Sequence, residues 1–160
     1  MKLGLALRGL HRAEDELADK LLQVSDRHKA DQDVFYLGQE LATWSQGHVR
    51  LLAQAAARYD VDLAPEPHGG SGSLAGAREE LGETVGRAPD AALLLLVDVR
   101  EVYTMASGVS VDWELVAQAA QGLRDTELLA LTKRCHPETL RQARWANAKL
   151  KESATQILVS

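Results

Sequence analysis

Apolar and charged residues alternate along this chain with a period that predicts four long helices. Apolar side chains recur at spacings of four and three positions, which places them on one face of a helix. The first stretch shows this most clearly, because every inward position is apolar except Glu14 and the terminal His28. We expect these faces to pack against one another in the interior. The four helices are expected over residues 3–30, 33–59, 89–122 and 125–158.

The third stretch is the most apolar part of the chain. It holds four consecutive leucines, residues 93–96, followed by an apolar stripe that continues to Leu123. Four consecutive leucines cannot share one stripe of a half-exposed helix. We therefore expect this segment to be surrounded by other parts of the protein on most sides.

Turn signals group the four helices into two antiparallel hairpins. A short polar break at residues 31–33 ends the first helix, and Asp125 is expected to cap the start of the fourth. Pro137 lacks a backbone N–H and is expected to kink or interrupt that fourth helix. Residues 60–88 contain prolines and a run rich in glycine and serine, which predicts a long crossover with a short helix at 74–85.

Composition supports one helical domain and argues against several classes of function. The chain has 160 residues, of which 46% are hydrophobic and 4% aromatic, so residues 1–160 are expected to form a single all-α domain. Its formal net charge of -5 gives no positive field for phosphates, so nucleic acid is not an expected partner. The apolar run at 91–97 is far shorter than the ~20 residues that a bilayer requires, so a membrane is not expected either. The lone Cys135 excludes an intramolecular disulfide, and the amino terminus resembles no export signal, which favours a cytoplasmic protein.

Polar residues interrupt the apolar stripes at a few positions. Glu14 and His48 each lie 17 positions from residue 31, at the first turn, and Glu101 and Asn147 each lie 23 positions from residue 124, at the second. In an antiparallel pair, residues equally distant from the turn lie at the same height. Each hairpin is therefore expected to place two polar residues opposite one another. We expect both pairs to share one level of the bundle.

On these residues the chain resembles the ferritin-like superfamily, four-helix bundles of two hairpins joined by one long crossover. Members bind two metal ions through a Glu on the first and third helices and a Glu-x-x-His on the second and fourth. The resemblance implies that Glu14 and Glu101 occupy the two single-acid positions. It implies that Ser45-x-x-His48 is the second-helix motif with its Glu lost.

The resemblance also implies that Arg144-x-x-Asn147 is the fourth-helix motif with both ligands lost. The last helix is further similar to that of uncharacterised bacterial ferritin-like proteins, which carry a Trp-x-x-x-Lys pattern, here Trp145 and Lys149. A di-iron centre relies on four carboxylates, and hard cations prefer oxygen ligands. Only two of these carboxylates remain here, so the site is expected to be degenerate.

The remaining residues predict a polar cluster without metal in the interior. Arg144 is expected to point inward, where a guanidinium donates hydrogen bonds and cannot coordinate a metal. It would pair with Glu14 and Glu101, because burying those acids unpaired costs several kcal/mol each. His48 and Asn147 would complete the hydrogen bonds.

Two functional hypotheses remain open. The first is a non-catalytic binding or structural module that has lost its di-iron centre and has no cofactor or catalytic residue. The alternative is a mononuclear redox or metal-storage protein that holds iron or manganese with Glu14, His48 and Glu101. Beside these two, a homo-oligomeric partner-binding protein is a third hypothesis, because bundles associate through flat helix faces.

Two further residue pairs invite a catalytic interpretation. Asp98 and Glu101 lie one helical turn apart and resemble an acid–base pair, although a salt bridge to Arg100 or to a neighbouring helix is the simpler interpretation. Cys135 and His136 resemble a nucleophile and its base. Adjacent helical residues point about 100° apart, however, so a buried structural Cys135 is favoured.

Overall fold

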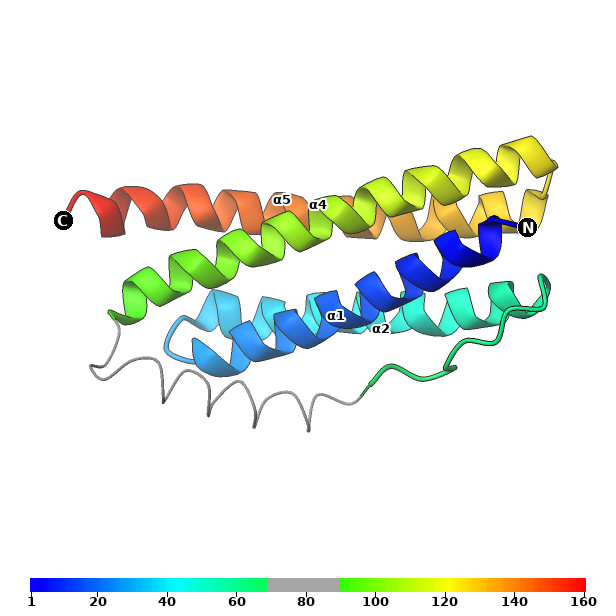
Figure 1. The fold of residues 1–160 in the computed structure, drawn as a ribbon. Coiled ribbons are helices and arrows are strands. Elements are labelled where there is room, and N and C mark those ends of the chain that lie inside the picture. Colours follow the sequence, from blue (N-terminus) through cyan, green and yellow to red (C-terminus); the bar gives the residue numbers. More distant parts are fainter. Residues whose placement is uncertain (69–89) are drawn as a thin grey trace.

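Four α-helices make up the computed structural model, which describes residues 1–68 and 90–160 (Figure 1). They are α1 (Leu3–Arg27), α2 (Gln32–Ala57), α4 (Ala91–Leu123) and α5 (Thr126–Leu158). The described residues contain no strand, which confirms the all-α prediction. Residues 60–68 have no regular secondary structure, and the expected helix at 74–85 lies outside the described residues. None of the described helices is long and apolar enough to cross a membrane.

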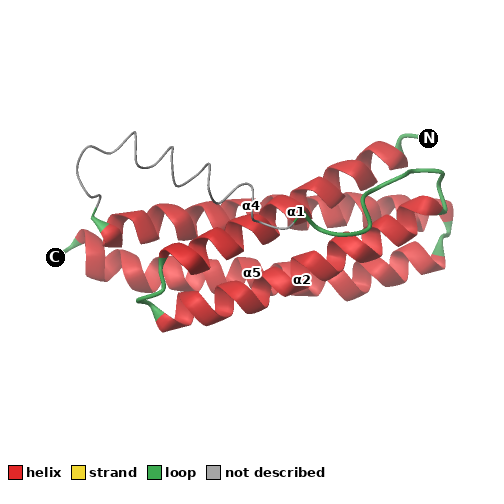
Figure 2. Ribbon diagram, turned by 90° about the horizontal axis from the view of Figure 1, so that it is seen from below, coloured by secondary structure: helices red, strands yellow, loops and turns green. Residues whose placement is uncertain are grey.

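The helices form two antiparallel hairpins that lie side by side (Figures 1 and 2). The closest pairs are α1 with α2 and α4 with α5, while α1 also packs along α4. Contact between α2 and α5 is sparser. The α1–α2 turn and the α4–α5 turn lie at opposite ends of the bundle, with the amino terminus beside the α4–α5 turn (Figure 1).

Aspartate side chains cap the starts of three helices. Asp31, Asp90 and Asp125 accept hydrogen bonds from the backbone N–H groups of Val34, Ala92 and Leu128, respectively. The carboxylates thereby accept hydrogen bonds from N–H groups that have no partner within the helix. Their negative charge also interacts favourably with the positive amino-terminal end of the helix dipole. The Asp125 cap confirms the prediction from the sequence.

The apolar stripe of α1 is buried along its whole length, as predicted. Its members are Leu3, Leu7, Leu10, Glu14, Leu17, Leu21, Val24 and His28. The stripe of α4 is buried from Val99 to Ala120. The leucine run that precedes it is not surrounded as expected, because Leu96 is buried while Leu93 and Val97 are exposed.

The apolar pattern of the sequence predicts that Leu140, Asn147 and Leu150 face inward, but the buried face of α5 differs from this by about one position. Its buried residues are Leu128, Thr132, Cys135, Thr139, Gln142, Ala143, Ala146 and Ser153. Half of these residues are polar. The apolar residues Leu140 and Leu150 lie beside this face and are half-buried. The predicted interruption at Pro137 is absent, since α5 continues through it. Pro137 is exposed, and so is Lys133, whose backbone carbonyl loses its helical partner because proline has no N–H.

Close packing of α1 on α2 depends on Gly38. A Cβ at this position would lie 2.9 Å from the Cβ of Ser25 and 3.2 Å from the carbonyl oxygen of Leu21. The Ser25 hydroxyl donates a hydrogen bond to the carbonyl oxygen of Phe35 at 2.5 Å. Ser25 therefore cannot move away without breaking this contact between the two helices.

We expect Gly38→Ala to lower the free energy of unfolding by about 1–3 kcal/mol, because overpacking outweighs the better helix propensity of alanine. Gly47→Ala in the same helix is the matched control, since a Cβ there meets nothing within 4 Å. It is expected to raise the free energy of unfolding by about 0.5–1 kcal/mol. Urea denaturation measures both values. If both variants stabilised the protein, the inference that α1 and α2 pack too closely at Gly38 for a Cβ would be wrong.

Candidate functional site

A buried carboxylate at the centre of the bundle contacts all three other helices. Glu14 on α1 is completely buried, and its Oε1 accepts three hydrogen bonds. His48 Nδ1–H on α2 donates at 2.8 Å, Trp113 Nε1–H on α4 at 2.8 Å, and the Thr139 hydroxyl on α5 at 3.3 Å. One oxygen atom thus ties the four helices together at a single level. We call Glu14, His48, Trp113 and Thr139 the central cluster.

His48 carries a positive charge inside this cluster. Burial lowers its pKa, but hydrogen bonds with Cys135 and Glu14 outweigh burial and raise the pKa to about 10. Its Nε2 lies 3.3 Å from Oε1 of Glu138, and its ring meets that of Trp113 edge to face. At neutral pH both ring nitrogens are therefore protonated and both donate hydrogen bonds.

Ser45 lies in the interior beside the cluster, as expected, and bonds to α5. Gln142 Nε2 donates hydrogen bonds to the Ser45 hydroxyl and to the carbonyl oxygen of Leu41, both at 2.9 Å. Gln142 is fully buried between α2 and α5. The position that would carry a Glu ligand in the ferritin-like motif thus takes part in an interhelical hydrogen bond.

The prediction that Glu101 lies in the interior is wrong. Its side chain is 53% exposed, and its Oε2 lies 2.6 Å from Nζ of Lys20. Equal distances from the two turns do not give equal heights, because those turns lie at opposite ends of the bundle (Figure 1). Trp113 is the α4 residue that reaches Glu14, and Glu101 precedes it by about 18 Å along the helix at ~1.5 Å per residue.

Arg144 and Asn147 also lie outside the central cluster, contrary to the prediction. Arg144 is exposed and Asn147 is half-buried. Both line a groove between α4 and α5 with a volume of about 260 Å³. The one-position error in the inward face of α5 explains this difference, because Thr139 and Gln142 occupy the positions that face the core.

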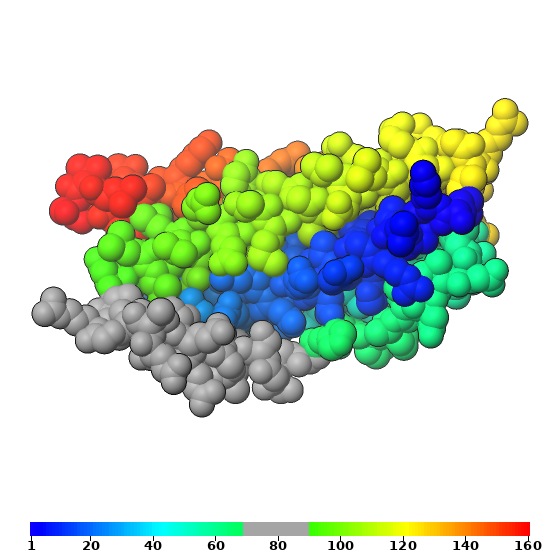
Figure 3. All heavy atoms as spheres, in the orientation of Figure 1, coloured from blue at the N-terminus to red at the C-terminus, as the bar shows by residue number. Residues whose placement is uncertain are grey.

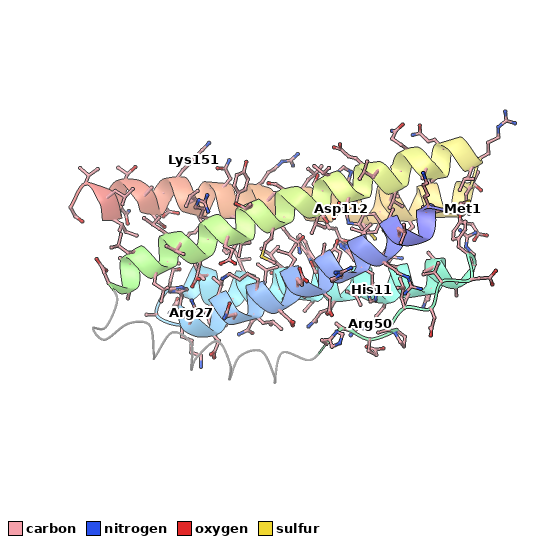
Figure 4. All side chains as sticks on the ribbon, viewed as in Figure 1. Met1, His11, Arg27, Arg50, Asp112 and Lys151 are labelled. Carbon is pink, nitrogen blue, oxygen red and sulfur yellow. The ribbon has the colours of Figure 1, made fainter. Side chains whose placement is uncertain are left out.

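A second buried carboxylate, Asp98, accepts hydrogen bonds from two basic side chains of α1 and from the imidazole of His28, which caps that helix. His28 Nε2–H donates to it at 2.7 Å, Arg27 Nη1–H at 3.1 Å and Lys20 Nζ–H at 3.3 Å. Burial raises the pKa of Asp98, but the His28 hydrogen bond and the charges of Lys20 and Arg27 outweigh it and hold the pKa below the usual value. The expected salt bridge to a neighbouring helix is confirmed. Figure 4 labels Arg27 at this end of the bundle.

Cys135 and His136 do not form a nucleophile–base pair. Cys135 is buried and contacts His48, whereas His136 Nε2 lies 2.7 Å from the Ser110 hydroxyl on α4. The two side chains therefore point to different neighbours, as helix geometry predicts. Sequence reasoning missed Trp113 and Thr139 as polar members of the core, since both resemble ordinary packing residues.

The segment that follows α2 is fastened to the outer side of α1. His11 Nε2–H donates to the carbonyl oxygen of Ala64 at 2.9 Å, and Arg50 forms an ion pair with Glu66. His68 lies 2.5 Å from a carboxylate oxygen of Asp15. Figure 4 labels His11 and Arg50 beside this segment. His11 is therefore buried, because this segment covers it.

The residues present do not fit a di-metal centre of the ferritin-like kind. Glu14 Oε2 is buried without a hydrogen-bond partner in the described structure, so one carboxylate oxygen is free. Protonated His48 has no lone pair to offer, and Glu101 lies at another level. Among the described residues, no three His, Cys, Asp or Glu side chains are grouped to hold a metal ion. The ligand set Glu14, His48 and Glu101 is thus not assembled.

No protein-family model, curated protein or solved structure matches this chain. The ferritin-like resemblance stays a prediction.

We expect the ion pair of Glu14 and His48 to make stability depend on pH. The pKa of His48 is raised from 6.5 to about 10, so its contribution is fully present below pH 6.5 and is lost as pH rises towards 10. The difference in free energy of unfolding between wild type and His48→Gln should therefore shrink by several kcal/mol across this range. Urea denaturation at a series of pH values measures it.

A direct readout of the same protonation state is the ¹⁵N chemical shift of the His48 ring at pH 7.5. Both nitrogens are expected at the shift of a protonated imidazolium. A neutral ring, together with a pH-independent difference between wild type and His48→Gln, would contradict the charge assignment.

We expect Asp98→Asn to lower the free energy of unfolding by about 3 kcal/mol, because it leaves Lys20 and Arg27 without their buried carboxylate. Glu101→Gln is the matched control, since it also removes one acid that contacts Lys20. It should cost less than about 1 kcal/mol, because its carboxylate is largely in water. Chemical denaturation at pH 7 compares the two, and equal losses would show that Asp98 is no more important than a surface acid.

Proposed function

We propose that this chain is a four-helix bundle of the ferritin-like type that serves as a non-catalytic binding or structural module. In this proposal the ion pair of Glu14 and His48 occupies the level where relatives of that type hold two metal ions. The observation that carries the proposal is the geometry of the His48 ring, whose Nδ1 lies 2.8 Å from Oε1 of Glu14 and whose Nε2 lies 3.3 Å from Oε1 of Glu138. Both of its nitrogens donate hydrogen bonds, so the ring contributes to a closed polar network and offers nothing to a metal.

The arrangement of the helices supports the architectural part of the proposal. Each hairpin is antiparallel, and α2 ends at the opposite end of the bundle from the start of α4 (Figure 1). A single long connection between two hairpins has this geometry. The expected homo-oligomer and cytoplasmic location stay predictions, and exposed Val111 and Leu115 on α4 favour the former.

The burial of the central cluster supports a non-catalytic role. Glu14 and Thr139 are fully buried and His48 is 2% exposed, so a substrate has no access to them. Their partners are side chains from the neighbouring helices rather than groups that face a cavity. A buried ion pair of this kind contributes little net stability, but it specifies helix register because any shift leaves a charge unpaired.

The metal content of the purified protein tests the proposal. After incubation with Fe(II) or Mn(II) without chelator and removal of free ions, we expect far less than one metal ion per chain by elemental analysis. Arg144→Glu should leave the content unchanged, because Arg144 lies on the surface. About one ion per chain in wild type, lost in His48→Ala, would overturn the proposal and favour the mononuclear alternative.

A further inference from the structure

The groove between α4 and α5 is a concave site on the outer side of the second hairpin. These two helices pack together along much of their length (Figure 1). The volume of about 260 Å³ lies just below the range of pockets for drug-sized ligands, which fits a smaller molecule. It is lined by Tyr103, Ser107 and Ser110 from α4 and by Leu140, Ala143, Arg144 and Asn147 from α5.

The charge of the groove favours an anionic ligand. Arg144 is the charged residue of the lining, and no carboxylate lines it. Arg144 is exposed, and no ion pair within the described part of the chain occupies its guanidinium, so the group is open to a ligand. A guanidinium presents a planar fork of donors that matches a carboxylate in a bidentate manner.

The remaining lining residues supply both polar and apolar contacts. Asn147 offers an amide to orient a bound group, whereas the Ser107 hydroxyl donates to the carbonyl oxygen of Tyr103 at 2.8 Å and the Ser110 hydroxyl is held 2.7 Å from Nε2 of His136. Leu140 and Ala143 form an apolar part of the wall. A largely apolar wall with a few convergent polar groups is typical of small-molecule sites.

We propose that this groove binds a small organic carboxylate, with the carboxylate on Arg144 and the apolar body against Leu140 and Ala143. The proposal rests on the proposed function, because it names the binding surface of the module. Inorganic phosphate is disfavoured, since one Arg and an apolar wall suit it poorly. Acyl transfer is disfavoured too, because no carboxylate in the described structure contacts the His136 ring to orient it as a base for Ser110.

Isothermal titration calorimetry with benzoate as the probe tests the proposal, with neutral benzamide as its isostere. Wild-type protein should bind benzoate saturably, and benzamide at least about tenfold more weakly, because the charge-assisted pair with Arg144 is lost. Arg144→Gln should weaken benzoate binding by at least about tenfold. Arg12→Gln is the matched control. It removes the same charge from an exposed position on α1 and should leave the affinity for benzoate unchanged.

A second variant, Ser107→Leu, fills the groove without changing charge and should also abolish benzoate binding. Retained helical circular dichroism shows that each variant is folded. Absence of saturable binding, equal affinity in Arg144→Gln, or displacement of benzoate by equimolar phosphate would each overturn the proposal. These outcomes are independent of the metal content at the central cluster, so failure here is distinguishable from failure of the proposed function.

Discussion

The hydrogen bonds to Glu14 Oε1 are the constraint on which this bundle depends. A buried carboxylate without partners is costly, and here its three donors come from three different helices. Sliding any one helix by a turn would remove a donor while leaving the charge in place. The apolar stripes make the helices associate, and the carboxylate selects one register among the many that apolar packing alone would allow.

Sequence reasoning succeeded where a polar residue interrupted a strongly apolar stripe. Glu14 and His48 are such residues, and the structure places their side chains 2.8 Å apart. It failed on α5, because Thr139 and Gln142 make the inward face polar and the apolar pattern follows its flank. It also failed for Glu101. Whether residues of the two hairpins lie at the same height depends on whether the two turns lie at the same end of the bundle or at opposite ends. The spacing within a hairpin does not contain that information.

Polar side chains of the two hairpins lie both in the interior of the bundle and on its surface. In the interior, each donor of His48 meets an acceptor, and the cluster has no exposed face. The helices α1 and α4 lie side by side (Figure 3), and the buried Asp98 on α4 contacts Lys20, Arg27 and His28. Arg144 lies in the groove between α4 and α5, whose lining includes no carboxylate.

The placement of the two turns at opposite ends has an electrostatic consequence. Each helix runs antiparallel to the neighbours that it packs against (Figure 1). The positive amino-terminal end of every helix dipole therefore lies beside the negative carboxyl-terminal end of another, and the dipoles largely cancel. Beyond either end of the bundle, the electric field that an approaching ligand meets therefore comes mainly from the side chains.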